Sequence, residues 1–142
     1  MVYEQIDHTQ AREIINFQIS YNQRKIKATW ALAVVIAGMF LLEEYFGGSQ
    51  NIAVLTRMGA NVSERVKEGE YYRLLSSVFL HAGFMHVFFN TYVLFALGGF
   101  FNRILGESKY VVIFLSSGIV GSLASVYFGK ANVSVGASGA IW

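Results

Sequence analysis

YVVIFLSSGIVGSLASVYF occupies residues 110–128 and contains no charged side chain. As an α-helix rising 1.5 Å per residue, this stretch is about 28 Å long, close to the thickness of the hydrocarbon core of a bilayer. A backbone in hydrocarbon must satisfy its own hydrogen bonds, and a helix does so within one segment. The stretch therefore predicts a membrane-spanning helix.

Two more apolar stretches predict spans over about residues 28–46 and 84–105. Most of the second span lies in a region, 74–102, that has no Asp, Glu, Lys or Arg. That region is longer than one perpendicular span, so we expect a segment that leads into the helix from the membrane surface. A fourth apolar run starts at 136–142, but seven helical residues cover only about 10 Å and do not cross a bilayer. The sequence is thus interpreted as the N-terminal part of a longer protein, truncated within a fourth span.

The composition also indicates a membrane protein. Hydrophobic residues make up 54% of the chain and charged residues 14%, and the mean hydropathy is +0.44, which is too apolar for an ordinary soluble domain. Cysteine is absent, which excludes disulfides, thiolate metal sites and cysteine nucleophiles. The net charge of +2, without a sustained basic patch, argues against nucleic acid as a partner. The predicted fold is all-α, a polytopic transmembrane helical bundle in the lipid bilayer.

Residues 1–27 form a polar segment ahead of the predicted membrane domain, 28–142. Mixed charges separate its isolated apolar side chains, so we interpret it as an amphipathic surface segment and not as a secretory signal peptide. It ends in Arg24, Lys25 and Lys27 beside the first span, and the positive-inside tendency therefore predicts a cytoplasmic N-terminus. The lack of a transit segment favours a multi-pass protein of a bacterial plasma membrane. The oligomeric state stays open.

Ser138 lies in Gly136-Ala137-Ser138-Gly139, where a polar loop turns into an apolar run. Unpaired backbone N–H groups at a helix start can hold a developing oxyanion, and the glycines let a substrate backbone approach. These features suit a nucleophilic serine. The alternative is that the small residues only provide a packing contact between membrane helices.

His86 and Asn90 are four residues apart, so on a helix they share one face with Leu94 and Gly98. An imidazole and an amide are costly to bury in hydrocarbon, so this stripe is expected to face protein or a wet cavity. The alternative is a purely structural pair of hydrogen-bonding groups. His81, five residues before His86, lies off this face and is expected to support the loop from the membrane interface.

Two other polar features receive structural interpretations. Ser117, Gly121 and Ser125 recur every four residues in the third span and predict a packing seam of small side chains. Glu43 and Glu44 are expected to be interfacial and hydrated, because they lie next to a loop.

Residues 69–90 and 135–140 together resemble the rhomboid family of intramembrane serine proteases. The first segment contains Tyr72-Arg73 and His81-Ala82-Gly83-Phe84-Met85-His86-Val87-Phe88-Phe89-Asn90, and the second contains Gly136-Ala137-Ser138-Gly139. The order of the two segments, their spacing and the spans between them carry the resemblance. The chain departs from the family pattern in two places: Tyr72 replaces a tryptophan, and Asn102-Arg103 replaces a Glu-x-Arg sequence at the end of the second span.

The resemblance implies a serine endopeptidase that cleaves transmembrane protein substrates in or near their spans. It implies that Ser138 is the nucleophile and that His86 and Asn90 bind the oxyanion. The supporting residues it implies are Gly136, Gly139, His81 and Arg73. It also implies a Ser-His dyad whose histidine lies beyond Trp142, so this chain alone is expected to be inactive, and no metal or other cofactor is expected.

Two alternatives remain at this point. A non-catalytic rhomboid-like protein would bind membrane segments without cleaving them. A transporter or channel subunit would instead use His86 and Asn90 to line a polar pathway.

Overall fold

The computed structural model describes residues 8–129 and 131–141 and is almost entirely helical. Within these residues, three helical stretches are long and apolar enough to cross a membrane: Thr9–Tyr45, Phe84–Leu105 and Glu107–Phe128. The first stretch includes the short break at residues 24–26. The predicted all-α, polytopic transmembrane fold is therefore confirmed.

The elements follow one another without long unstructured loops. In chain order they are α1 (His8–Gln23), α2 (Lys27–Tyr45), α3 (Ile52–Met58), β1 (Asn61–Val62), α4 (Ser63–Lys67), α5 (Arg73–Ser76), the 3₁₀ helix η1 (Ser77–Phe79), α6 (Phe84–Val93), the π-helical turn η2 (Leu94–Gly98), α7 (Gly99–Leu105), α8 (Glu107–Phe128), β2 (Val133–Ser134) and α9 (Ser138–Ile141).

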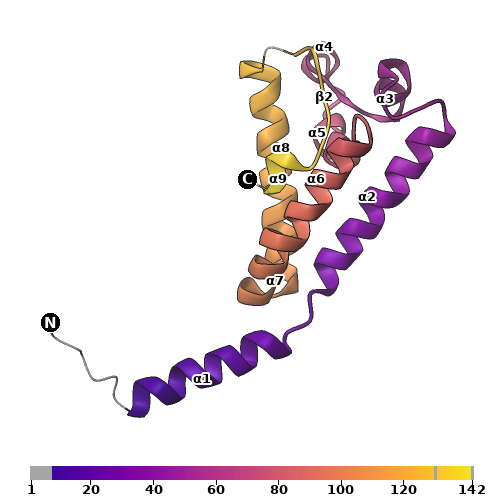
Figure 1. Ribbon diagram of the computed structural model, residues 1–142. Coiled ribbons are helices and arrows are strands. Elements are labelled where there is room, and N and C mark those ends of the chain that lie inside the picture. The colour runs from indigo at the N-terminus through magenta and orange to yellow at the C-terminus, as the bar shows by residue number, and fades with distance from the viewer. Residues whose placement is uncertain (1–7, 130, 142) are drawn as a thin grey trace, which may run out of the picture.

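Three long helices form the bundle: α2, α8, and the continuous helix made of α6, η2 and α7 (Figure 1). The short helices α3 and α4 gather at the end of the bundle where α2 and α8 finish, and α1 projects away from the opposite end. After α8 the chain turns back along the bundle through β2, so α9 lies beside α8 within the bundle and not at its end (Figure 1).

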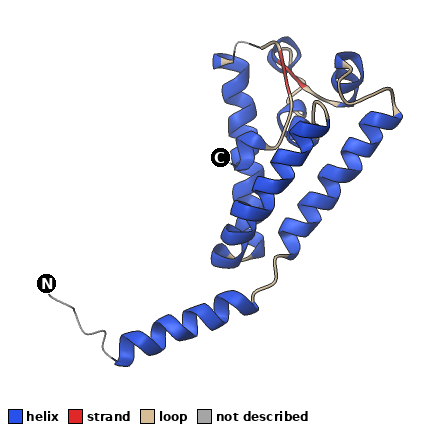
Figure 2. Ribbon diagram, in the orientation of Figure 1, coloured by secondary structure: helices blue, strands red, loops and turns tan. Residues whose placement is uncertain are grey.

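Two short antiparallel strands join the loop layer to the segment before α9 (Figure 2). Asn61 pairs with Ser134 and Val62 pairs with Val133. The buried Asn61 side chain adds hydrogen bonds from its Nδ2 to the Ser122 carbonyl (2.9 Å) and to the Ser134 hydroxyl (3.1 Å). The loop that follows α2 therefore fixes the path of the chain that leads to α9.

The core lies between the three long helices and includes Ile36, Leu94 and Phe114, each almost fully buried. Lipid tails are as apolar as these side chains, so the hydrophobic effect does not drive the helices together within the membrane. Close packing between the helices holds them together instead. Gly118 illustrates the fit, because a Cβ added there would lie 2.8 Å from a methyl group of Val78. Helix α8 thus packs against η1 through a position that needs glycine.

Many large apolar side chains point outward from the long helices, as expected of a surface in contact with lipid. Those more than half exposed include Trp30, Val34, Leu41, Phe89, Tyr92, Val112, Val120 and Tyr127. A soluble protein rarely exposes so much contiguous apolar surface. The surface and the three candidate spans agree that this is an integral membrane protein.

Two helix starts differ from the sequence-based expectation. Helix α8 begins at Glu107, three residues before the apolar run at Tyr110, because a helix continues past the charged residues at the interface. Helix α9 begins at Ser138 and not at Gly136, because Gly136 adopts a φ of +117°, which a helix cannot accept. Trp142, the last residue of the predicted fourth run, lies outside the described residues.

Candidate active site

Ser138 is the first residue of α9 and is exposed. Two backbone hydrogen bonds hold the loop before it: the Gly136 N–H donates to the Ser77 carbonyl (2.9 Å), and the Ala137 N–H donates to His81 Nε2 (3.4 Å). The Ala137 carbonyl then accepts from the backbone N–H groups of Ala140 (2.9 Å) and Ile141 (3.1 Å), which starts the helix. The position of Ser138 is therefore set by its neighbours on both sides.

A polar cavity of about 130 Å³ lies beside Ser138. Its lining consists of small side chains and hydroxyl groups: Ser77, Gly118, Gly121, Ser122, Ser125, Ser134, Val135, Gly136, Ser138 and Gly139. One water molecule needs roughly 10–15 Å³ of such space and two to four polar partners. The cavity meets both conditions for several waters, so water has room beside Ser138.

Gly121 and Ser125 of the small-residue seam, together with the adjacent Gly118 and Ser122, form one wall of this cavity. A Cβ added at Gly121 would lie 3.0 Å from the Gly139 Cα, so the backbones of α8 and α9 are in direct contact there. The Ser125 hydroxyl donates to the Ser134 hydroxyl at 3.0 Å. The predicted packing role of the seam is confirmed at Gly121 and Ser125, and their small side chains also border the cavity.

His86 lies in α6 and packs against the Ser138 loop through Gly136. A Cβ added at Gly136 would lie 2.7 Å from both Cε1 and Nε2 of the His86 ring. The imidazole therefore rests on the Gly136 backbone, two residues before Ser138. Two features require glycine at this position: the positive φ and the close contact with the His86 ring.

Asn90 lies one helical turn after His86 and is buried, at 7% exposure. Its Nδ2 donates to the His86 backbone carbonyl at 2.9 Å, which leaves a second N–H on the same nitrogen. The stripe that begins with these residues continues through Leu94 and Gly98, both buried, and faces the protein interior as predicted. Among the described residues, however, neither His86 nor Asn90 lines the 130 Å³ cavity.

His81 is fully buried next to the Ser138 loop. Its Nδ1 lies 3.2 Å from the Phe79 carbonyl, which can only accept, so Nδ1 carries the proton and Nε2 is free to accept from the Ala137 N–H. The His86 ring packs edge-on against it, with the ring centroids 5.2 Å apart. Burial, and then the nearby His86, lower the pKa of His81 to about 4. A neutral His81 is thus a fixed hydrogen-bonding support for the loop.

Glu43 belongs to this support, and its predicted hydration is wrong. It is fully buried in the last turn of α2, and its Oε1 accepts the His81 backbone N–H at 2.9 Å. Glu44, by contrast, is exposed and accepts the Ser49 N–H at 3.1 Å. Helical phase distinguishes the two, because Glu43 lies two turns after the buried Ile36 and therefore on the inward face of α2. The burial of Glu43 could therefore have been predicted from the sequence spacing alone.

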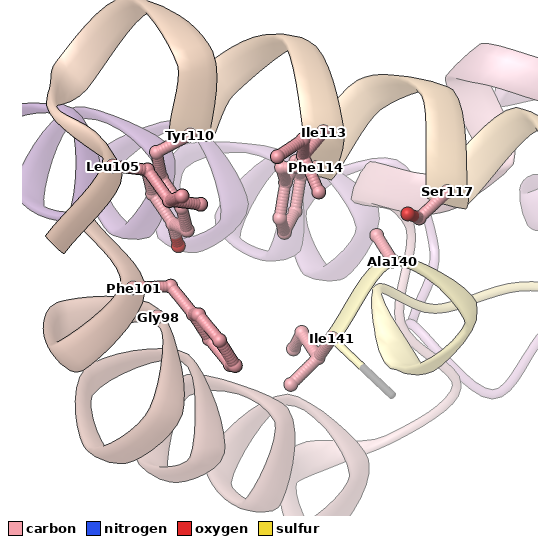
Figure 3. Close-up of a pocket in the computed structure, with 9 residues that line it drawn as sticks. All are labelled: Gly98, Phe101, Leu105, Tyr110, Ile113, Phe114, Ser117, Ala140 and Ile141. Atoms are coloured by element: carbon pink, nitrogen blue, oxygen red, sulfur yellow. The ribbon is translucent and has the colours of Figure 1, made fainter.

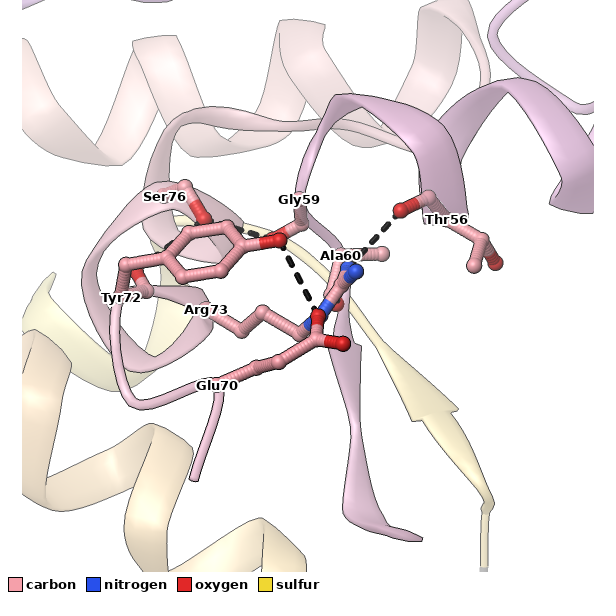
Figure 4. Close-up of polar contacts among 7 residues, drawn as sticks. All are labelled: Thr56, Gly59, Ala60, Glu70, Tyr72, Arg73 and Ser76. Carbon is pink, nitrogen blue, oxygen red and sulfur yellow. Dashed lines mark hydrogen bonds and ion pairs between the residues drawn. The ribbon is translucent and has the colours of Figure 1, made fainter. Parts of the chain in front are cut away.

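Arg73 anchors the loop layer (Figure 4). Its buried guanidinium pairs with Glu70 at 2.6 Å and donates from Nη1 to the carbonyls of Thr56 (2.8 Å) and Ala60 (3.0 Å). It also lies 5.2 Å from the centre of the Tyr72 ring, so the residue that departs from the family pattern makes a cation–π contact with Arg73. The ion pair lowers the pKa of Glu70. Arg73 acts on the site indirectly, because Ala60 immediately precedes the strand β1 that pairs with β2.

A second, apolar cavity of about 250 Å³ lies between α7, α8 and α9 (Figure 3). Phe101, Phe114 and Ile141 are among the side chains that line it. The two cavities share no lining residue, and this one lacks the row of hydroxyls found beside Ser138. It is suited to packing against another apolar segment and not to hydrolysis.

The structure therefore gathers Gly136, Gly139, His81 and His86 around the loop that carries Ser138. Asn90 lies deeper along α6, and Arg73 lies in the loop layer. The catalytic and oxyanion-binding roles of these residues stay predictions.

Comparison with known proteins gives the family. The model of the Rhomboid domain matches residues 68–142, more than half of the chain. The chain is 41% identical over 104 residues to Rhomboid protease GluP of Bacillus subtilis, a match that covers 73% of this chain and 20% of that protein. It is 37% identical over 78 residues to the Putative rhomboid protease YdcA of the same bacterium, covering 54% of this chain and 39% of that one.

A relative from another organism is also similar. Rhomboid-like protease 1 of Toxoplasma gondii is 40% identical over 87 residues, covering 60% of this chain and 29% of that protein. The chain belongs to the rhomboid family. It spans between a fifth and two fifths of the length of these three relatives.

Proposed function

We propose that the full-length protein is an intramembrane serine protease in which Ser138 is the nucleophile. The observation that carries this proposal is the place of Ser138 at the start of α9, beside a cavity lined by hydroxyls and glycines inside a bundle of membrane-spanning helices. Membership of the rhomboid family supports the same reaction, because several relatives are named as proteases.

In the proposed reaction the Ser138 oxygen attacks the carbonyl carbon of a client peptide bond while a base takes the hydroxyl proton. The C–N bond then breaks, the proton passes to the leaving amine, and an acyl-enzyme remains, which water from the polar cavity hydrolyses. The first N–H groups of a helix lack intrahelical partners, so α9 can offer backbone donors to the oxyanion. His86 and Asn90 would supply side-chain donors, and each such donor is worth roughly 10²- to 10³-fold in rate.

The base is proposed to be a histidine outside residues 1–142. His81 uses its Nδ1 proton on the Phe79 carbonyl and its Nε2 lone pair on the Ala137 N–H, so accepting a proton would break the contact that holds the loop. His8 begins α1, which projects from the other end of the bundle (Figure 1). The third histidine of the sequence, His86, is assigned to the oxyanion. Residues 1–142 alone are therefore expected to be inactive.

The proposed substrates are membrane proteins cleaved in or near a transmembrane segment. A transmembrane helix protects its peptide bonds by internal hydrogen bonds, so a client must unwind before Ser138 can reach a carbonyl. Segments with small, weakly helical residues near the cut are expected to be preferred.

Reconstituted full-length protein and a reporter with a glycine-rich transmembrane segment would test the proposal. Ser138→Ala is expected to abolish cleavage, whereas Ser116→Ala, which removes an exposed hydroxyl on α8, is expected to leave it unchanged. Cleavage by Ser138→Ala would refute the assignment of the nucleophile. Tight binding of the reporter by the wild type without cleavage would instead support a non-catalytic binder, and ion or solute flux insensitive to Ser138→Ala would support a transporter.

A further inference from the structure

A second candidate site lies at the opposite end of the bundle from the loop layer, where α1 ends and α2 begins. A pocket of about 540 Å³ is lined there by residues 22–27 together with Trp30 and Arg103. Four of the lining side chains are cationic: Arg24, Lys25, Lys27 and Arg103. They come from three elements, the hinge between α1 and α2, the start of α2, and α7.

Hydrogen bonds hold this hinge in place. Arg24 donates from Nη1 to the carbonyls of Arg103 (2.8 Å) and Ile104 (3.1 Å), at the end of α7. Asn102, buried on the same turn, donates from Nδ2 to the Lys25 carbonyl at 3.3 Å. The cations are therefore brought together by the fold and do not depend on an anion to gather them.

The charges at the hinge are not neutralised within the described part of the chain. Among the described residues, the ion pair that forms joins Arg73 to Glu70. Both lie in the loop layer, at the opposite end of the bundle from the hinge. Arg103 instead packs against the Tyr21 ring, 5.4 Å from its centre, a contact that leaves its charge in place. The hinge pocket thus combines preset geometry with uncompensated positive charge, which is what an anion site requires.

The pocket lies where the membrane surface is expected. Trp30 is 59% exposed in the first turn of α2, and aromatic rings of this kind favour the headgroup level. Helix α1 leaves the bundle at a steep angle and exposes Ile14, Ile15 and Phe17, side chains that a bilayer surface would cover (Figure 1). A ligand in this pocket can place its anionic group among the cations and its apolar part against the neighbouring helices.

We propose that the hinge pocket binds the phosphate headgroup of an anionic phospholipid. Free phosphate shares the same anionic chemistry, but the exposed apolar surface on both sides of the pocket favours a lipid. Bound lipid would couple the hinge after α1 to α2 and α7 through Lys25, Lys27 and Arg103. The proposal does not depend on the proteolytic function, because it concerns a different end of the molecule.

Native mass spectrometry of the full-length protein in detergent would test this site. The probes are dioctanoyl phosphatidylglycerol, dioctanoyl phosphatidylcholine and inorganic phosphate. Removing one cation near a membrane surface weakens anionic lipid binding roughly fivefold, so Lys25→Gln with Lys27→Gln is expected to weaken phosphatidylglycerol binding about 25-fold. The charge-preserving variant Lys25→Arg with Lys27→Arg is expected to retain binding.

The matched control removes the same charge at the other end of the bundle. Arg65→Gln with Lys67→Gln changes two exposed cations of α4 and is expected to leave phosphatidylglycerol binding unchanged. Equal losses in the hinge and α4 variants would overturn the proposal, as would phosphatidylcholine binding as tightly as phosphatidylglycerol. Phosphate binding as tightly as the lipid would overturn the assignment to lipid. The altered lysines are exposed and make no contact that the fold depends on, so all variants are expected to fold.

Discussion

Gly136→Ala tests whether the His86 ring positions the Ser138 loop. The new Cβ would lie 2.7 Å from two ring atoms of His86, closer than real Cβ contacts allow, at a residue whose φ is +117°. A non-glycine residue held in such a backbone region costs about 1–3 kcal/mol, and the clash must add a shift of the ring or the loop. We expect a loss of stability of at least about 2 kcal/mol, combining both effects.

The displacement should also reduce activity. A misplacement of about 1 Å at a reacting group costs roughly 100-fold in rate, so cleavage by the full-length Gly136→Ala protein is expected to fall by about that factor. The stability of the variant would be measured by thermal melting in detergent, and its activity with the transmembrane reporter. Gly38→Ala is the control, because a Cβ at Gly38 meets nothing within 4 Å and the residue lies within helix α2. It should melt at or slightly above the wild-type temperature.

Combining Gly136→Ala with His86→Ala separates the two costs. Removing the ring relieves the clash but not the backbone strain, so the two changes should be non-additive in thermal stability. Additive effects, or a Gly136→Ala protein that melts and cleaves like the wild type, would refute the view that the ring rests on this glycine.

Three further predictions concern the residues that support the site. The fold lowers the pKa of His81 from 6.5 to about 4, and the groups that face this residue are His86 and Glu43. Neutral His81 therefore stabilises the fold fully above pH 6.5. This contribution, about 3 kcal/mol, is lost as the pH falls toward 4. The melting temperature of the wild type relative to His81→Gln should therefore fall as the pH is lowered from 8 to 4; a constant difference between the two curves would contradict the reasoning. Glu43→Gln keeps an oxygen acceptor for the His81 N–H, whereas Glu43→Ala leaves that buried donor unpaired at a cost of about 1–3 kcal/mol. Glu43→Ala should therefore melt at a lower temperature than Glu43→Gln, and equal melting temperatures would contradict this role of Glu43. Arg73→Ala removes a charged donor from two carbonyls and is expected to cost about 3 kcal/mol or more, with Arg73→Lys intermediate; the check is chemical denaturation, and a wild-type midpoint for Arg73→Ala would count against the anchoring role.

The long helices could be predicted from the sequence because each is decided locally. A run without charges, about as long as a bilayer is thick, leaves a helix as the way to satisfy its backbone, and the predicted span at 84–105 coincides with Phe84–Leu105. The inward face of α6 followed from the spacing of polar residues, and the packing seam of α8 from the spacing of small ones.

Features that depend on distant parts of the chain were not predicted. The pairing of Asn61 with Ser134 joins segments more than seventy residues apart, and no local pattern in a two-residue strand signals it. The burial of Glu43 could have been predicted from its helical phase with Ile36, but its partner, the His81 N–H on another element, could not. The π-helical turn at Leu94–Gly98 was not predicted either, because a helical sequence pattern does not distinguish it from an α-helix.

Covalent labelling of the full-length protein with a fluorophosphonate probe would test the central claim most directly. Digestion and mass spectrometry would then locate the adduct. We predict a single modified residue, Ser138, despite the hydroxyls of Ser77, Ser122, Ser125 and Ser134 around the same cavity. Labelling of one of those serines, or labelling that persists in Ser138→Ala, would contradict the account of this site.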